Sequence, residues 1–178
     1  SGGVFVGGYF TSVAGQPRQR IVKLNAAGTA LQSFAVPVDN GQVQSIAVNP
    51  AGDRVAISGN FTSVGGGDDP GFGLYLADAS SGAGLPLPAN TQVRNAGETA
   101  GFMSLATDGT KFYGAGWHFN GTGNTEGTFA VNWADGAIAW IEDCHGDTYD
   151  IAIVNEIAYS ASHKHYCGNS GGFPQTEI

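Results

Sequence analysis

Residues 7–13 read GGYFTSV, and 51 positions further along the chain residues 58–64 read SGNFTSV. A third, degraded copy, GWHFN, occupies residues 116–120. Self-similarity at a fixed period of this size is typical of stacked supersecondary units. The repeat bears on function as well as on fold, because repeat scaffolds bind more often than they catalyse.

The segments around these copies share one pattern, in which an apolar run, a polar turn and a second apolar run follow one another. The clearest examples span residues 43–59, 102–114 and 150–160, and weaker ones span 20–34, 73–82 and 128–140. Short β-rich runs on either side of a turn that carries Gly, Asp or Asn predict hairpins. No segment has a helical hydrophobic period of useful length.

Two hairpins in about 50 residues make four antiparallel strands, which is the unit of a β-propeller blade. We therefore expect an all-β propeller with approximate units at residues 1–40, 41–98, 99–146 and 147–178. The first unit begins in its second strand and the last ends after its second strand, which gives roughly three and a half blades. Closed propellers have about four to eight blades, so we expect this chain to be part of a longer protein.

The composition points to a turn-rich extracellular protein. The chain has 29 glycines among 178 residues, only 12% charged residues and a formal net charge of −8. Seven Lys and Arg residues argue against nucleic acid or an anionic membrane surface as a partner, because both require basic surface. No run of about 20 apolar residues is present, so the sequence predicts no membrane insertion.

Two cysteines, Cys144 and Cys167, are present. In a secreted protein two cysteines pair more often than they stay free. A Cys144–Cys167 disulfide would close a loop of roughly 20 residues and stabilise the fold by about 3 kcal/mol in the chain-entropy model. The alternative is a pair of separate buried thiols.

Residues 4–25, from VFVGGYFTSVAG to RIVKLN, resemble the repeat of the delta-sixty-type β-propellers that are common in actinobacterial secreted proteins. The resemblance extends from Val4 to about Pro174 and weakens along the chain, and in the second unit Gly71-Phe72-Gly73 replaces the expected Arg-bearing segment. It implies a propeller and an extracellular location, and it implies no established catalytic residues. Actinobacteriophage tail proteins are a second setting for such propellers.

The predicted ligand site is the position of the repeat at which the residue type changes from unit to unit. Aligning the units on Phe10, Phe61 and Phe119 makes Tyr9, Asn60 and His118 equivalent, and His163 takes this place in the fourth unit. Equivalent positions in neighbouring blades lie on one face of a propeller. The candidate ligand-binding residues are Asn60, Trp117, His118, His163 and His165.

His118, His163 and His165, together with Asp147, are weak candidates for a metal site, since a His-x-His pair on a strand directs both rings to one side. The spacing matches no zinc motif, and histidines bonded to loop backbone are the simpler reading. The loop at residues 65–69 contains Asp68 and Asp69 but lacks the alternating acids of a calcium loop. We therefore expect no cofactor, with calcium or another divalent ion as the alternative.

Other side chains leave two functions open. Loop acids (Asp68, Asp69, Glu142, Asp143, Asp147 and Asp150) would serve a glycosidase only if two of them faced each other across a cleft. Aromatic residues gather in the second half (Trp117, Trp133, Trp140, Tyr149 and Tyr166), where they would either stack on sugars or pack between blades.

The sequence thus predicts a non-catalytic extracellular propeller module for binding, adhesion or assembly. The expected partners are a protein or glycan at the cell surface and the remaining blades, from the same longer chain or from another subunit. A glycan-active propeller enzyme and a phage tail or host-recognition component are the alternatives.

Overall fold

A computed structural model describes residues 2–119, 122–143 and 145–165, and in these residues every regular element is a strand apart from one short 3-10 turn. The strands are β1 (Gly3–Gly7), β2 (Ser12–Val13), β3 (Gln16–Pro17), β4 (Ile21–Asn25), β5 (Val43–Val48), β6 (Arg54–Gly59), β7 (Leu74–Asp78), β8 (Ala100–Thr107), β9 (Lys111–His118), β10 (Gly127–Asn132), β11 (Ile138–Asp143), β12 (Thr148–Val154) and β13 (Ile157–Ser162). The 3-10 turn, η1, spans Pro88–Thr91. The all-β prediction is confirmed.

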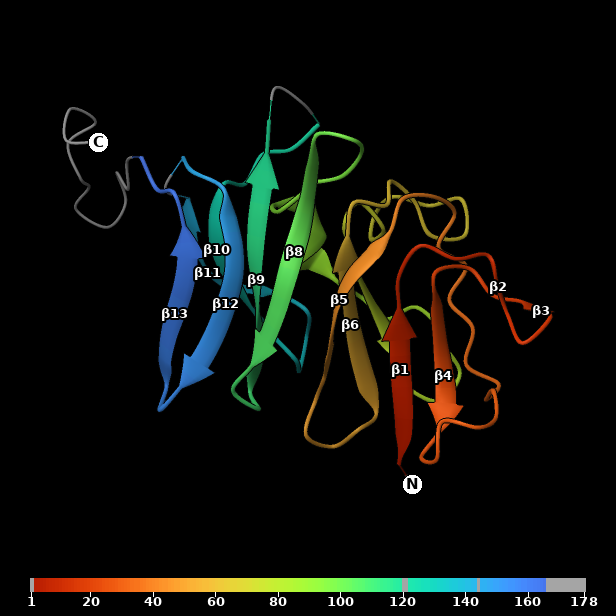
Figure 1. The fold of residues 1–178 in the computed structure, drawn as a ribbon. Coiled ribbons are helices and arrows are strands. Elements are labelled where there is room, and N and C mark those ends of the chain that lie inside the picture. Colours follow the sequence, from red (N-terminus) through yellow and green to blue (C-terminus); the bar gives the residue numbers. More distant parts are fainter. Residues whose placement is uncertain (1, 120–121, 144, 166–178) are drawn as a thin grey trace.

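Four antiparallel sheets follow one another along the chain (Figure 1). They are β1–β4, β5–β6–β7, β8–β9–β10–β11 and β12–β13, and the small β2–β3 hairpin projects beside the first of them. The three clearest predicted hairpins are confirmed as β5–β6, β8–β9 and β12–β13. No helix in the described residues is long and apolar enough to cross a membrane.

Consecutive sheets pack against each other mainly through their first strands. β8 contacts β5 and β6 of the preceding sheet, and β12 in turn contacts β8 and β9. The first strands of the last three sheets each contain a register shift at the same place, between Val43 and Ser45, Phe102 and Ser104, and Thr148 and Asp150. One irregularity repeated in three sheets indicates that the sheets are structurally equivalent units, because β-bulges are specific features of a fold.

The repeated phrase has a structural role, as hydrogen bonds in the first two units show. The carbonyl oxygen of Phe10 accepts from the N–H of Arg20, and that of Phe61 accepts from the N–H of Gly73. The N–H groups of Gly8 and Gly59 donate to the carbonyl oxygens of the same two partners. The phrase is therefore the end of the second strand and its exit turn.

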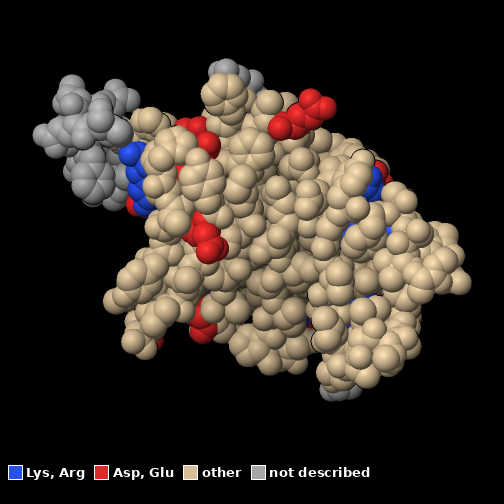
Figure 2. Space-filling model, in the orientation of Figure 1, with Lys and Arg blue, Asp and Glu red and all other residues tan. Residues whose placement is uncertain are grey.

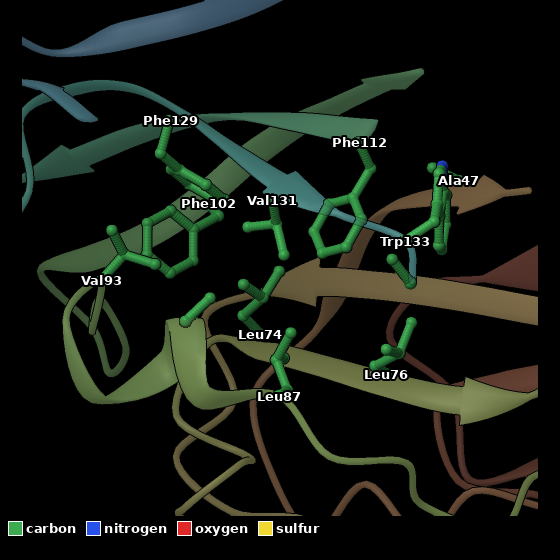
Figure 3. Close-up of a cluster of buried hydrophobic side chains, with 12 residues drawn as sticks. Ala47, Leu74, Leu76, Leu87, Val93, Phe102, Phe112, Phe129, Val131 and Trp133 are labelled. Carbon is green, nitrogen blue, oxygen red and sulfur yellow. The ribbon is translucent and has the colours of Figure 1, made fainter. Parts of the chain in front are cut away.

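The core consists of apolar layers between consecutive sheets. Figure 3 shows the layer between the second and third sheets, where Phe102, Phe112 and Phe129 lie opposite Leu74 and neighbouring aliphatic side chains. The rings of Phe102 and Phe129 meet edge-to-face with centroids 5.1 Å apart. Burying a side chain of this size stabilises a fold by about 1.5–3 kcal/mol, so these layers hold the row of sheets together.

Serine hydroxyls add polar links between the second and third sheets. The Ser45 Oγ accepts a hydrogen bond of 2.9 Å from the backbone N–H of Leu105. The Ser58 Oγ, which is fully buried, donates to the carbonyl oxygen of Phe102 at 3.1 Å. Both links run from a side chain of one sheet to the main chain of the next.

Candidate functional site

The ends of the second strands bring one set of equivalent residues to the same end of successive sheets. The pairs at the bulges are Val43–Gly59, Phe102–Gly116 and Thr148–Ser162, so the residues that follow, Asn60, Trp117 and His163, are equivalent. The hydrogen bonds at Phe10 and Phe61 assign Tyr9 to the same place in the first unit. The register therefore corrects the alignment made from the sequence, which had set His118 in this series.

The physical reason is a one-residue difference in how the third unit ends its second strand. β9 continues to His118, which pairs with Ala100, so the phenylalanine of the third unit is displaced by one position. Phe61 is 0% exposed in the core, whereas Phe119 is 68% exposed. Aligning these two phenylalanines from the sequence was wrong, because only one of them fills an inter-sheet layer.

Asn60 connects the second sheet to the loop before the third. Its Oδ1 accepts from the backbone N–H of Gln42 at 2.8 Å, and its Nδ2 donates to the carbonyl oxygen of Gly97 at 3.1 Å. The backbone of Asn60 bonds to the same two residues. The amide of Asn60 is therefore engaged in holding the loops.

Trp117 lies against Asn60 across Gly101. A Cβ built on Gly101 would come within 3.1 Å of the Trp117 Nε1 and 3.2 Å of the Asn60 Cβ, so a side chain here would require its neighbours to shift by a few tenths of an ångström. The Trp117 Nε1 is buried and has no hydrogen-bond partner among the protein atoms described. Two of the five predicted ligand residues thus both lie beside Gly101.

His163 and His165 also come together, beyond the end of β13. Their rings meet edge-to-face with centroids 5.1 Å apart, and the Nδ1 of His163 lies 2.9 Å from the hydroxyl of Tyr149. The backbone N–H of His163 donates to the carbonyl oxygen of Asp147 at 3.1 Å. These residues form a small aromatic and imidazole group on the fourth sheet.

The metal candidates do not assemble within the part of the chain that the structure describes. There, no three His, Cys, Asp or Glu side chains lie close enough together to hold an ion. His118 sits on the third sheet and packs beside Gly123. The Oδ1 of Asp147 is buried and has no hydrogen-bond partner among the residues that the structure describes.

The loop acids proposed for glycan hydrolysis are mostly engaged in structural contacts. Asp68 pairs with Arg94 at 3.0 Å, and Glu142 pairs with Lys164 at 2.9 Å. Asp150 accepts from the Ser104 hydroxyl at 2.6 Å, and Asp143 accepts from the backbone N–H of Glu126 at 3.1 Å. These contacts explain the acids as parts of turns and inter-sheet links.

The aromatic residues of the second half divide between packing and exposure. Trp133 is buried against Phe112, and its Nε1 donates to the Thr107 hydroxyl at 3.0 Å. The ring of Trp140 packs against the ring of Tyr113, with the ring centroids 5.9 Å apart. Trp140 and Tyr149 are both partly exposed. Tyr166, Cys144 and Cys167 lie outside the described residues, so the predicted disulfide remains a prediction.

An acid and a tyrosine at the β8–β9 turn have shifted pKa values. Burial acts to raise the pKa of Asp108, but hydrogen bonds from the Tyr113 hydroxyl and from the N–H groups of Lys111 and Thr110 outweigh it and lower that pKa to about 2. Burial, followed by the hydrogen bond to Asp108 and its charge, raises the pKa of Tyr113 to about 12. The pair holds the turn, with the acid ionised and the phenol neutral over the whole physiological range.

Two buried asparagines were missed by sequence reasoning, because a polar residue in a loop gives no sign that it is buried. The side chain of Asn90 accepts from the N–H groups of Gly71 and Phe72 and donates to the carbonyl oxygens of Phe72 and Val93. The side chain of Asn95 donates to the carbonyl oxygens of Gly101, Trp117 and Thr125, and accepts from the N–H groups of Asn124 and Thr125. Both are 0% exposed and organise the loops between the second and third sheets.

A cavity of about 410 Å³ opens beside the first sheet, away from every predicted site residue. Its lining consists of Pro17, Arg18, Gln19, Ile21, Ala35, Val36 and Pro37. The surface seen in Figure 2 is mostly uncharged, with acidic and basic side chains in small separate groups. That face shows no extended basic patch, in keeping with the net charge of −8.

Comparison with known proteins found a match to one family model, within the first unit. Residues 2–30, which include β1 to β4, match the model of a family described as a domain of unknown function (DUF5122) beta-propeller. No curated protein and no solved structure matched the chain. The match, the antiparallel sheets and their repeated bulge agree on a propeller-type repeat.

Proposed function

We propose that the chain is a non-catalytic extracellular β-propeller module of the delta-sixty type, which acts by binding and assembly. The observation that carries this proposal is the open face of the last sheet, β12–β13. Side chains at this face occupy positions that the next sheet covers in each of the preceding two units.

The equivalence of these positions follows from the strand register. Ala47 pairs with Ala56 in the second sheet, Ala106 with Tyr113 in the third and Ala152 with Tyr159 in the fourth. Ala56 is 0% exposed and Tyr113 is 7% exposed, because the following sheet lies over each. Tyr159 is 56% exposed.

The open face is apolar beyond this one pair. Val154 and Ile157, which pair at the end of the hairpin, are both more than half exposed. Ile151 and Ile153, on the opposite face of β12, pack against the third sheet as Leu105 packs against the second. A contiguous exposed apolar patch of this kind marks an interaction surface.

The partner that fits this surface is a further antiparallel sheet of the same repeat. Its first strand would present branched aliphatic side chains, as Leu105 and Ile151 do at the two existing interfaces. The remaining blades of the same chain or another subunit would supply it. A protein or glycan at the cell surface would then bind at the ends of the strands. The residue type at this equivalent position differs from unit to unit: it is Asn60, Trp117 and His163 in turn.

The test is the accessibility of a thiol introduced on this face in the protein as isolated from its source. Ala161→Cys puts a small thiol on the open face, and Ala51→Cys puts the same thiol in the exposed β5–β6 turn as a matched control. We expect a maleimide to label the first much more slowly than the second, after subtraction of the background from Cys144 and Cys167.

Protection that is lost on dilution would identify another subunit as the partner, and protection that persists would identify the same chain. Equal labelling of the two variants at every protein concentration would contradict the proposal. Incubation with bacterial and plant polysaccharides tests the non-catalytic part, for which we expect no release of reducing ends.

A further inference from the structure

We propose that the cavity between the turns of the third and fourth units binds a small amino acid zwitterion, whose ammonium meets Glu156 and whose carboxylate meets Lys111. The cavity has a volume of about 370 Å³ and is lined by Asp108, Thr110, Lys111, Tyr113 and Glu156. It lies where the β8–β9 and β12–β13 turns end their sheets, at the lower side of Figure 1. The equivalent residues that end the second strands are at the other end of the sheets, so this site is separate from the proposed function.

The cavity lies where the turns of successive units become shorter. The turns between first and second strands span residues 49–53, 108–110 and 155–156 in the second, third and fourth units. The first two of these turns are in close contact, since a Cβ built on Gly109 would lie 3.3 Å from the Pro50 Cγ. In the shortest turn, Asn155 and Glu156 have φ of 51° and 66°, as in a two-residue hairpin turn. A cavity takes the place of close contact between this turn and the β8–β9 turn.

Lys111 and Glu156 put opposite charges on two walls of the cavity. Lys111 lies on the same side of β9 as Tyr113, because side chains alternate along a strand, and Glu156 belongs to the facing turn. Glu156 is exposed and Lys111 is partly exposed, so a ligand can reach both. In the described part of the chain no ion pair joins them, and the Lys111 Nζ makes a long contact of 3.4 Å with the Thr110 hydroxyl. Two such charges across one cavity match a ligand that carries both signs.

Asp108 and Tyr113 form a fixed part of the wall. The Oδ1 of Asp108 accepts from the N–H groups of Thr110 and Lys111 at 2.7 and 2.8 Å, and its Oδ2 accepts from the Tyr113 hydroxyl. Asp108 therefore adds negative potential while its oxygens stay engaged in the turn. After burial and the effects of Asp108, the charge of Glu156 also helps to raise the pKa of Tyr113, which places this carboxylate close to the phenol. The Glu156 carboxylate and the Tyr113 oxygen are the acceptors for an ammonium.

The charges of the lining define the ligand chemistry. Two carboxylates and one ammonium disfavour a simple anion, and Lys111 repels a simple cation. A zwitterion is neutral overall and pairs with both signs. Because charge pairs at exposed sites are individually weak, we expect binding in the millimolar range and a loss of about three- to tenfold for each ligand charge removed.

The experiment titrates the protein with glycine, β-alanine and γ-aminobutyrate, whose ammonium and carboxylate are progressively further apart. Each amino acid is compared with the alkylamine that lacks its carboxylate and with the alkanoate that lacks its ammonium. Binding is followed at neutral pH by the backbone amide signals of Thr110, Lys111 and Glu156 in heteronuclear NMR spectra. We expect saturable shifts at these residues with at least one amino acid, and weaker binding of its amine and its alkanoate.

Three variants assign each ligand charge to its partner. Lys111→Met should bring the amino acid and its alkylamine to equal affinity, and Glu156→Gln should do the same for the amino acid and its alkanoate. Glu98→Gln is the matched control, because Glu98 is an exposed carboxylate in the loop before β8, at the other end of that strand from the cavity. A spectrum that keeps its dispersion shows that each variant is folded.

Equal affinity for the amino acid, its amine and its alkanoate would overturn the proposal, as would unchanged selectivity in folded Lys111→Met and Glu156→Gln variants. Shifts that map outside the cavity would overturn it as well, and so would the lack of saturable binding of all three amino acids in the millimolar range. None of these results bears on the labelling of Ala161→Cys, so the site and the proposed function are tested separately.

Discussion

Replacement of Asn95 by Asp changes one buried nitrogen to oxygen and is the sharpest test of how the loops between the second and third sheets are held. The Nδ2 of Asn95 donates to the carbonyl oxygens of Thr125 at 2.7 Å and Trp117 at 3.0 Å, with a longer contact to Gly101 at 3.4 Å. In Asn95→Asp an oxygen that cannot donate when ionised faces all three acceptors. The shape of the side chain is otherwise unchanged.

The expected loss can be worked from these contacts. Each of the two short hydrogen bonds is worth about 1 kcal/mol net, and leaving a buried group unsatisfied costs about 1–3 kcal/mol. An uncompensated charge at a buried site costs about 3–5 kcal/mol when a partner is removed. We therefore expect Asn95→Asp to lower the free energy of unfolding by about 3–5 kcal/mol at neutral pH, a large share of the 5–15 kcal/mol typical of a domain.

The assay is urea unfolding followed by tryptophan fluorescence at neutral and mildly acid pH. Burial among carbonyl oxygens raises the pKa of the introduced carboxyl, so the difference from wild type should shrink as the pH falls through that pKa and the group becomes neutral. Asn25→Asp is the matched control. Asn25 is the last residue of β4 and is partly exposed, and its Oδ1 accepts from the Thr29 N–H at 2.8 Å, so the change should stay within about 0.5 kcal/mol.

A loss of less than about 1 kcal/mol for Asn95→Asp, or a loss equal to that of the Asn25 control, would refute the reasoning, because a satisfied buried donor of this kind cannot be removed so cheaply.

Two further perturbations test the β8–β9 turn and the layer between the second and third sheets. The folded pKa of Tyr113, about 12, lies above the ordinary value of 10.0, so its contribution to stability is present below pH 10 and is lost as the pH rises from about 10 to about 12. The folded pKa of Asp108, about 2, lies below 3.8, so its contribution is lost as the pH falls from about 4 to about 2. Both slopes should diminish in Tyr113→Phe when unfolding is measured across pH, and identical slopes in wild type and variant would show that the hydrogen bond is unimportant. For the layer, Gly114→Ala should destabilise the fold by about 1–3 kcal/mol, since a Cβ there would lie 2.2 Å from the ring of Phe129. Both glycine variants are compared with wild type in thermal melts. Gly67→Ala should be close to neutral, because its added carbon meets only an ordinary contact of 3.7 Å. Equal effects of the two changes would contradict the packing argument.

The hairpins could be predicted from the sequence because their turns are marked by local chemistry. The turn at residues 49–53 contains Asn49, whose Oδ1 accepts from the N–H groups of Asp53 and Arg54. Such Asx turns depend on neighbouring residues alone, so the sequence carries them in full. The order of the remaining strands could be predicted because the unit recurs after 51 residues.

The equivalence of residues at the strand ends could not be predicted, because one extra residue in β9 shifts the third unit relative to its neighbours. Phe119 resembles Phe61 in sequence, but only Phe61 has an apolar layer to enter. The cavity at Arg18 was also beyond sequence reasoning. Its lining comes from two segments, residues 17–21 and 35–37, which come together only in the folded chain.

The serine links between sheets bear on how such a repeat can change over time. Ser45 and Ser58 each bind the main chain of the next sheet, at the N–H of Leu105 and the carbonyl oxygen of Phe102. Every residue except proline offers the same N–H, and every residue offers the same carbonyl. A unit joined in this way places little demand on the side chains of its neighbour. Neighbouring units are then free to diverge in sequence, one at a time, without losing the contact that keeps them stacked.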